Sequence, residues 1–321
     1  MRTFLPLVVA LIASAAAAQH YQPVRHTLPA PVFAGSETET QVQADMGITV
    51  ERDRPARWRL AEHRRLERTL AAVRPQRAGT VDAFVIVAAL DSDPVFGREA
   101  REAARVLARR YRADGHVILL AGGDGTRDSE LPTGSPGNLD LALARVAEVM
   151  DPAEDVLILY TTSHGAPFGL YYNDGDQGYG AVSPNRLWSQ LSMLGIRNRL
   201  ILLSACYSGV FVPLLSSDTT AIVTAAAADR PSFGCQADND WTFFGDALIN
   251  TALRKPQPLA AAVTQARNLI ASWEKGAALD ASSPQVVVGA GAQRWLAVLE
   301  RDLPAALPPV GRPAIALLRA K

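Results

Sequence analysis

Short runs of apolar residues alternate along this chain with longer segments whose apolar residues recur every three or four positions. The runs predict strands of a parallel sheet covered on both faces, and the spaced segments predict amphipathic helices. Strands are predicted at 81–90, 116–120, 156–160, 200–203, 220–226 and 285–288. Helices are predicted at 55–73, 95–111, 139–150 (with Asn138 as N-cap), 183–194, 243–253, 259–273 and 293–299. This alternation predicts one doubly wound α/β domain, a mainly parallel sheet between two layers of helices.

The chain divides into four segments. Residues 1–18 have the form of a signal peptide, with Arg2, an apolar stretch at 4–13 and an A-x-A cleavage site ending at Ala18. Residues 19–74 form a leader that ends in an amphipathic helix. Its aperiodic, proline-containing first part, residues 19 to about 50, is expected to be extended and partly mobile. Residues 75–302 form the α/β domain, and residues 303–321 a proline-rich tail expected to be loose. We therefore expect a secreted or periplasmic protein without stable membrane insertion, an uncleaved anchor being the alternative.

Composition narrows the function classes. The formal net charge is zero, which gives no electrostatic case for binding nucleic acid. Only Cys206 and Cys235 are present, so the chain is not a disulfide scaffold. A disulfide between these two cysteines is an alternative to a free thiol.

Two predicted strands end in side chains that suit nucleophilic catalysis. Strand 156–160 leads into His164, and strand 200–203 leads into Cys206, 42 positions later. Neighbouring parallel strands place such residues side by side at their carboxyl ends. An imidazole beside a thiol can take or give the proton that the reaction of the thiol requires. The backbone N–H groups of Gly165 and Cys206 are predicted to stabilise an oxyanion.

No metal or cofactor is expected. The chain has five histidines, and Glu62-His63 lacks the second histidine of an H-E-x-x-H zinc site. The acidic segment 173–176 lacks the full ligand series of a calcium loop, so a plain turn is predicted there.

Residues 162–165 (Thr-Ser-His-Gly) and 204–209 (Ser-Ala-Cys-Tyr-Ser-Gly) resemble the His-Gly and Cys motifs of the legumain-like cysteine peptidases, the C13 family of the caspase-like clan. Segments 224–226 and 230–235 are also similar to legumains. Segments 93–99 and 239–245 look like the bacterial secreted branch of the family. The resemblance covers roughly residues 75–290.

This resemblance implies a caspase-like fold and a catalytic dyad that acts on a protein or peptide substrate. His164 would be the general acid/base and Cys206 the nucleophile. Water would hydrolyse the acyl-enzyme, or an amine would capture it in a transamidase or ligase. The alternatives are a peptide-binding pseudoenzyme with the same fold and a metal hydrolase.

The resemblance also implies a substrate pocket. Arg98, Ser232 and Asp246 match pocket residues of legumains, whereas Ser204 stands where legumains have an acidic residue. The legumain asparagine that helps to orient the histidine has no match near Phe96. We expect cleavage after Asn or Asp.

Overall fold

The computed structural model describes residue 26, residues 28–122 and residues 130–316. The predicted signal peptide lies outside these residues. Within the described ranges, no helix combines the length and apolarity that crossing a bilayer requires.

A six-stranded sheet runs through the centre of the described chain in the order β10-β9-β8-β4-β2-β3. All neighbouring strands are parallel except β10, which pairs antiparallel with β9. The strands are β2 Ala83–Ala89, β3 Val117–Leu120, β4 Val156–Thr162, β8 Arg199–Ser204, β9 Thr220–Thr224 and β10 Gln285–Val288. The predicted mainly parallel sheet is confirmed.

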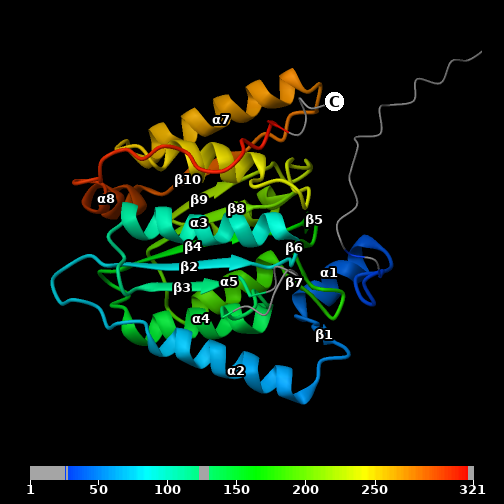
Figure 1. Cartoon of the computed structure of the whole chain (residues 1–321). Coiled ribbons are helices and arrows are strands. Elements are labelled where there is room, and N and C mark those ends of the chain that lie inside the picture. The colour runs from blue at the N-terminus through cyan, green and yellow to red at the C-terminus, as the bar shows by residue number, and fades with distance from the viewer. Residues whose placement is uncertain (1–25, 27, 123–129, 317–321) are drawn as a thin grey trace, which may run out of the picture.

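Helices cover both faces of this sheet (Figure 1). In β2, Val85 and Val87 pack on the same face as α3, η2, α7 and α8, while Phe84 and Ile86 pack on the face of α2, α4, α5 and α6. The helices are α2 Ala56–Ala71, α3 Pro94–Arg110, α4 Pro136–Val149, α5 Pro184–Met193, α6 Val212–Leu215, the π-helix η2 Gly245–Ala252, α7 Leu259–Gly276 and α8 Ala290–Leu299. A short 3₁₀ helix, η1 Ser208–Phe211, precedes α6. The predicted three-layer, doubly wound architecture is confirmed.

The direction of winding reverses between β2 and β4. From β2 the chain passes to β3 at the edge, returns to β4 on the other side of β2, and continues outward to β8 and β9. In open α/β sheets, ligands bind outside the carboxyl ends of the strands at such a reversal. The loops that follow β2, β4 and β8 are therefore the ones to inspect for a site.

A smaller antiparallel sheet lies beside that edge, in the order β1-β7-β6-β5. Its strands are β1 Val50–Glu51, β5 Gly165–Ala166, β6 Gly169–Asp174 and β7 Gly178–Val182. β1 belongs to the leader, which also forms helix α1, Glu37–Asp45. The expectation that residues 19 to about 50 are extended and partly mobile is wrong where the structure describes a helix there, α1. Ser36 and Glu39 form a capping box that starts α1, and the Phe33 ring stacks on Phe168 at 5.1 Å.

Two further expectations are corrected. Helix α4 begins at Pro136 with Ser135 as its N-cap, whereas Asn138 uses its side chain to bind Glu62 and Thr133. The tail is bound rather than loose where it is described. Val310 bonds with Asn250 through both its N–H and its carbonyl, and the Ala314 N–H donates to Asp246 at 2.8 Å.

Candidate active site

The pairing of β4 with β8 sets the positions of His164 and Cys206. Thr162 lies opposite Ser204 in the parallel ladder, and His164 and Cys206 each follow two residues later. Gly165 packs against the Cys206 backbone so closely that a Cβ at Gly165 would lie 2.1 Å from the Cys206 carbonyl oxygen. The structure therefore brings the two predicted dyad residues to one edge of the sheet. Both are half-buried.

Cys206 lies at the tight turn that ends β8. The next residue, Tyr207, has a φ of 56°, and its N–H donates to the Arg230 carbonyl at 2.8 Å. Such left-handed residues are costly and concentrate at functional sites. The Ser232 N–H donates to the Cys206 sulfur at 3.2 Å. Both cysteines are free thiols.

The surroundings of Cys206 keep its thiol protonated. Burial raises the pKa of the Cys206 thiol, and the neighbouring Cys235 raises it further. Hydrogen bonds from Ser232 and the charge of His164 lower the pKa without reversing the shift. Cys206 is therefore a thiol at neutral pH in the free protein.

His164 is held by the loop that follows β2. Its Nε2 lies 3.6 Å from the Oδ2 of Asp93, and its ring meets the Phe96 ring edge-on at 5.0 Å. Burial lowers the pKa of His164, but Asp93 and Cys235 help to raise it well above its ordinary value. His164 is therefore a cation at neutral pH.

The predicted oxyanion donors stay a prediction. Gly165 opens β5, which pairs antiparallel with β6 opposite Leu170, and Cys206 lies beyond the end of β8. These two residues lie against each other, as two donors to one oxygen would have to.

Among the predicted pocket residues, Ser232 and Arg98 belong to the segments around this edge. Ser232 contacts the sulfur of Cys206. Arg98, on α3, donates to the backbone carbonyls of Ala237 and Asn239, and its Nε lies 3.7 Å from Asp240. Its side chain stays 41% exposed, which leaves part of the guanidinium on the surface.

Ser204 and Asp246 are buried and used elsewhere. The Ser204 hydroxyl bonds with the Thr242 hydroxyl at 3.0 Å. Asp246 accepts hydrogen bonds from Asn250 and from the backbone of Ala314. The structure does not bring the Asp246 carboxylate to Cys206, because it anchors the tail to η2.

Sequence reasoning missed a buried carboxylate behind the site. Glu99 is fully buried and accepts from the Tyr160 hydroxyl at 2.5 Å and from the Thr242 N–H at 2.8 Å. Thr242 in turn bonds with Ser204. Glu99 follows Arg98 directly, but nothing in the helical pattern marks it as buried.

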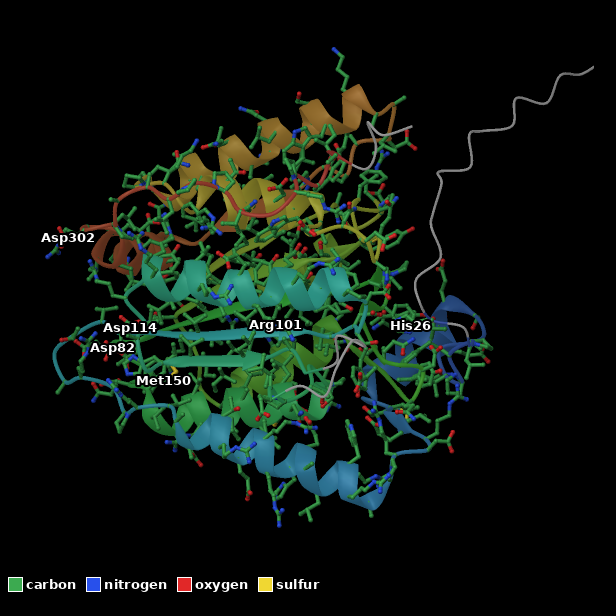
Figure 2. The ribbon with its side chains drawn as sticks, viewed as in Figure 1. His26, Asp82, Arg101, Asp114, Met150 and Asp302 are labelled. Atoms are coloured by element: carbon green, nitrogen blue, oxygen red, sulfur yellow. The ribbon has the colours of Figure 1, made fainter. Side chains whose placement is uncertain are left out.

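One further group of side chains lies beside the site. His26 places Nε2 2.9 Å from Asp91 and Nδ1 3.2 Å from Asp176, and Asp93 lies next to them. Metal ligands of this type would be a His nitrogen and carboxylate oxygens. Because both ring nitrogens face carboxylates at ion-pair distance, the geometry favours an imidazolium bridge over a metal site. Figure 2 labels His26 near α1.

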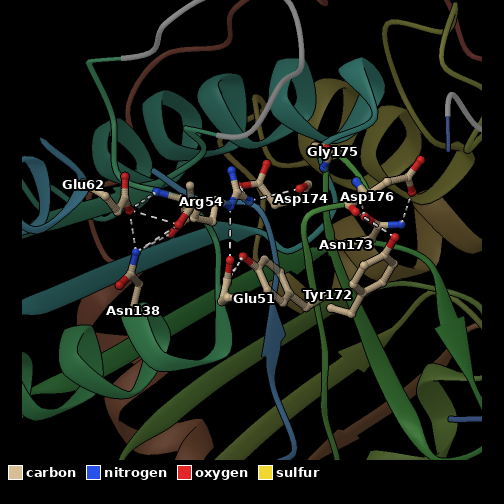
Figure 3. Close-up of polar contacts among 12 residues, drawn as sticks. Glu51, Arg54, Glu62, Asn138, Tyr172, Asn173, Asp174, Gly175 and Asp176 are labelled. Carbon is tan, nitrogen blue, oxygen red and sulfur yellow. Dashed lines mark hydrogen bonds and ion pairs between the residues drawn. The ribbon is translucent and has the colours of Figure 1, made fainter. Parts of the chain in front are cut away.

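The acidic segment 173–176 forms the predicted plain turn. Asp176 and Asn173 bond to each other, and Arg54 of the leader binds Asp174 at 2.6 Å (Figure 3). Asp174 is thereby paired with a cation, as a largely buried carboxylate requires. The turn ties the leader to the hairpin of β6 and β7.

Residues 133–293, half of the chain, match the model of the peptidase C13 family. The match includes His164 and Cys206 but not Asp93 or Arg98. A comparison with curated proteins found no match. Among solved structures, caspase-1 from Spodoptera frugiperda is similar with a TM-score of 0.44 and 14% identity, over 65% of this chain and 87% of that one.

Proposed function

The chain belongs to the peptidase C13 family, and from this premise we propose that it is a cysteine endopeptidase in which Cys206 is the nucleophile and His164 the general acid/base. The observation that carries the proposal concerns the Thr162–Ser204 pair of β4 and β8, next to the reversal of winding: His164 and Cys206 each lie two residues beyond their member of this pair. Membership of the family supports a cysteine peptidase acting on protein substrates. The assignment of the dyad and of its roles is our proposal.

The reaction follows from the protonation of the two groups. The Cys206 thiol loses its proton to solvent water, because His164 already carries one, and the sulfur attacks the carbonyl carbon of the scissile bond. The N–H groups of Gly165 and Cys206 stabilise the oxygen that becomes negative. His164, already protonated, gives its proton to the leaving amine as the C–N bond breaks.

The thioester on Cys206 then reacts a second time. His164, now neutral, takes a proton from water while the water oxygen attacks the thioester carbonyl. The carbon–sulfur bond breaks, and the sulfur leaves as a thiolate. The new carboxylic acid loses its proton through solvent to this thiolate, which restores the thiol while His164 stays protonated. An amine in place of water would form a new peptide bond, so hydrolysis and ligation share the same intermediate.

We also propose cleavage after Asn or Asp. Arg98 supports this, because its partly exposed guanidinium is a donor suited to an amide or carboxylate side chain. We further propose that the protein is exported, on the strength of the signal-like residues 1–18.

The test is mass spectrometry of the products formed from a peptide library by the wild type, Cys206→Ala and Cys235→Ala. We expect cleavage by the wild type, a loss of at least about 100-fold in Cys206→Ala, and continued cleavage by Cys235→Ala. Products in which two library peptides are joined by a new peptide bond would indicate ligation. Equal cleavage by wild type and Cys206→Ala would contradict the proposed nucleophile, and a preference for Arg or Lys at the cleaved residue would contradict the proposed specificity.

A further inference from the structure

The side chain of Asp93 is turned away from the helix that it precedes. Asp93 is the N-cap of α3, a position where an Asp side chain ordinarily accepts a hydrogen bond from the first turn. It makes no such bond, whereas Ser36, Ser135 and Ser183 all cap their helices in this way. Forgoing a cap destabilises the start of a helix, so another interaction must hold the carboxylate in this direction.

The carboxylate instead faces His164. Asp93 is 1% exposed, and its Oδ2 lies 3.6 Å from the imidazole Nε2. The backbone of Asp93 is fixed on both sides. Its N–H donates to the Asp91 carboxylate at 2.8 Å, and the residue that follows it, Pro94, has a backbone restricted by its ring. Phe96, one turn further, meets the imidazole ring edge-on. The first turn of α3 therefore contacts the imidazole through both a charge and a ring.

We propose that Asp93 is the positioning residue for His164, and that its carboxylate orients the ring and favours the imidazolium that protonates the leaving amine. The inference rests on the proposed peptidase function. The residue lies outside the matched segment 133–293, so the family match does not assign this role.

A charged partner has a consequence that an amide partner would not have. Among the described residues, the titratable groups that interact electrostatically with His164 are Asp93 and Asp91 from the loop after β2, Tyr171 from β6, and the thiols Cys206 and Cys235. Of those that raise the pKa of His164, Asp93 contributes most, and its carboxylate lies 3.6 Å from the ring. Removing that charge destabilises the imidazolium, so His164 loses its proton at a lower pH.

The test compares Asp93→Asn with Asp82→Asn. The Asn variant keeps the size of the side chain and removes its charge. Asp82 is an equally buried carboxylate that binds Arg77 at the other end of β2, where Figure 2 labels it far from His26. Both variants remove the charge of a buried carboxylate that faces a cationic side chain, but only Asp93 lies at the site.

Three measurements are made on the full chain: kcat and KM on a cleaved peptide, an NMR titration of the His164 ring, and thermal unfolding. We expect Asp93→Asn to lower kcat by about 10- to 100-fold with KM within about threefold. The midpoint of the His164 titration in Asp93→Asn should move by at least one pH unit toward acid. In Asp82→Asn, kcat and the His164 titration midpoint should both stay near those of the wild type.

An unchanged His164 titration in Asp93→Asn would overturn the proposal, and so would an equal loss of kcat in both variants. The titration needs no catalysis. If the wild type proves inactive, the proposed function fails, while the titration still decides whether Asp93 controls the charge of His164.

Discussion

At the scale of the residue, the site consists of a thiol and an imidazolium that both hold a proton at neutral pH. Burial raises the pKa of Cys206, and the carboxylates beside His164 outweigh burial there. In the proposed reaction, the nucleophile is thus formed from a neutral thiol, and the imidazolium that would protonate the leaving amine is present before substrate binds. Asp93, which supplies part of that charge, could not be identified from the sequence, because Asp-Pro before a helix equally predicts an ordinary N-cap.

Alkylation of Cys206 by iodoacetamide should report this state. Only the thiolate reacts, and the pKa of the thiol lies above its ordinary value of 9.0, so the rate should still be rising at pH 9. His164→Ala removes a charge that lowers this pKa, so its rate should be slower at each pH. The rate is followed by mass spectrometry of the peptide that contains Cys206. A plateau below pH 7 would show instead a preformed thiolate–imidazolium pair.

At the scale of the element, backbone pairing sets the spacing of the reacting groups. β4 and β8 are central strands, buried along their length, and the glycine after His164 lets the two loops touch. The sequence predicted these strands well, because continuous apolar runs identify them. The catalytic roles of the residues at their ends stay a prediction. The sequence prediction failed for helix α1 and for the start of α4, although both carry capping residues. These are Ser36 with Glu39 before α1, and Ser135 before Pro136 at α4.

Gly165→Ala should disrupt this contact. The added Cβ would lie 2.1 Å from the Cys206 carbonyl oxygen, so one of the two backbones must shift. A misplacement of 1 Å can cost about 100-fold in rate, and we expect a loss of that order in kcat/KM. Gly137→Ala is the matched control, since its Cβ meets nothing within 4 Å and alanine favours helix α4 by about 0.5–1 kcal/mol. Full activity in Gly165→Ala would show that the contact is not needed.

At the scale of the whole molecule, both terminal segments are built into the structure where it is described. The leader adds β1 to the smaller sheet, and the tail binds Asn250, Trp241 and Asp246. No periodicity could predict the tail contacts, because most of them use backbone groups, which every residue carries. Polar residues such as Asp246 therefore suggested a pocket role from the sequence alone, although they anchor the chain.

Deleting residues 304–321 should lower the free energy of unfolding by about 2–4 kcal/mol. The deletion removes several hydrogen bonds worth about 1 kcal/mol each and leaves the buried Asp246 without its backbone donor, offset in part by the entropy of the lost segment. Urea unfolding of the full chain and of the chain ending at Leu303 measures the difference in their free energies of unfolding. A chain ending at Ala316 keeps these bonds and serves as the control. Equal midpoints for the full chain and the chain ending at Leu303 would show that the tail contributes nothing.

The contacts of Arg312 link the tail to the segment that holds Arg98. Arg312 binds Asp238 and Asp240, and the same short segment supplies the carbonyls that hold Arg98. The tail thus completes the support of the residue that we propose to set specificity. A change that releases the tail from this segment would therefore affect the proposed substrate recognition as well as the stability of the fold.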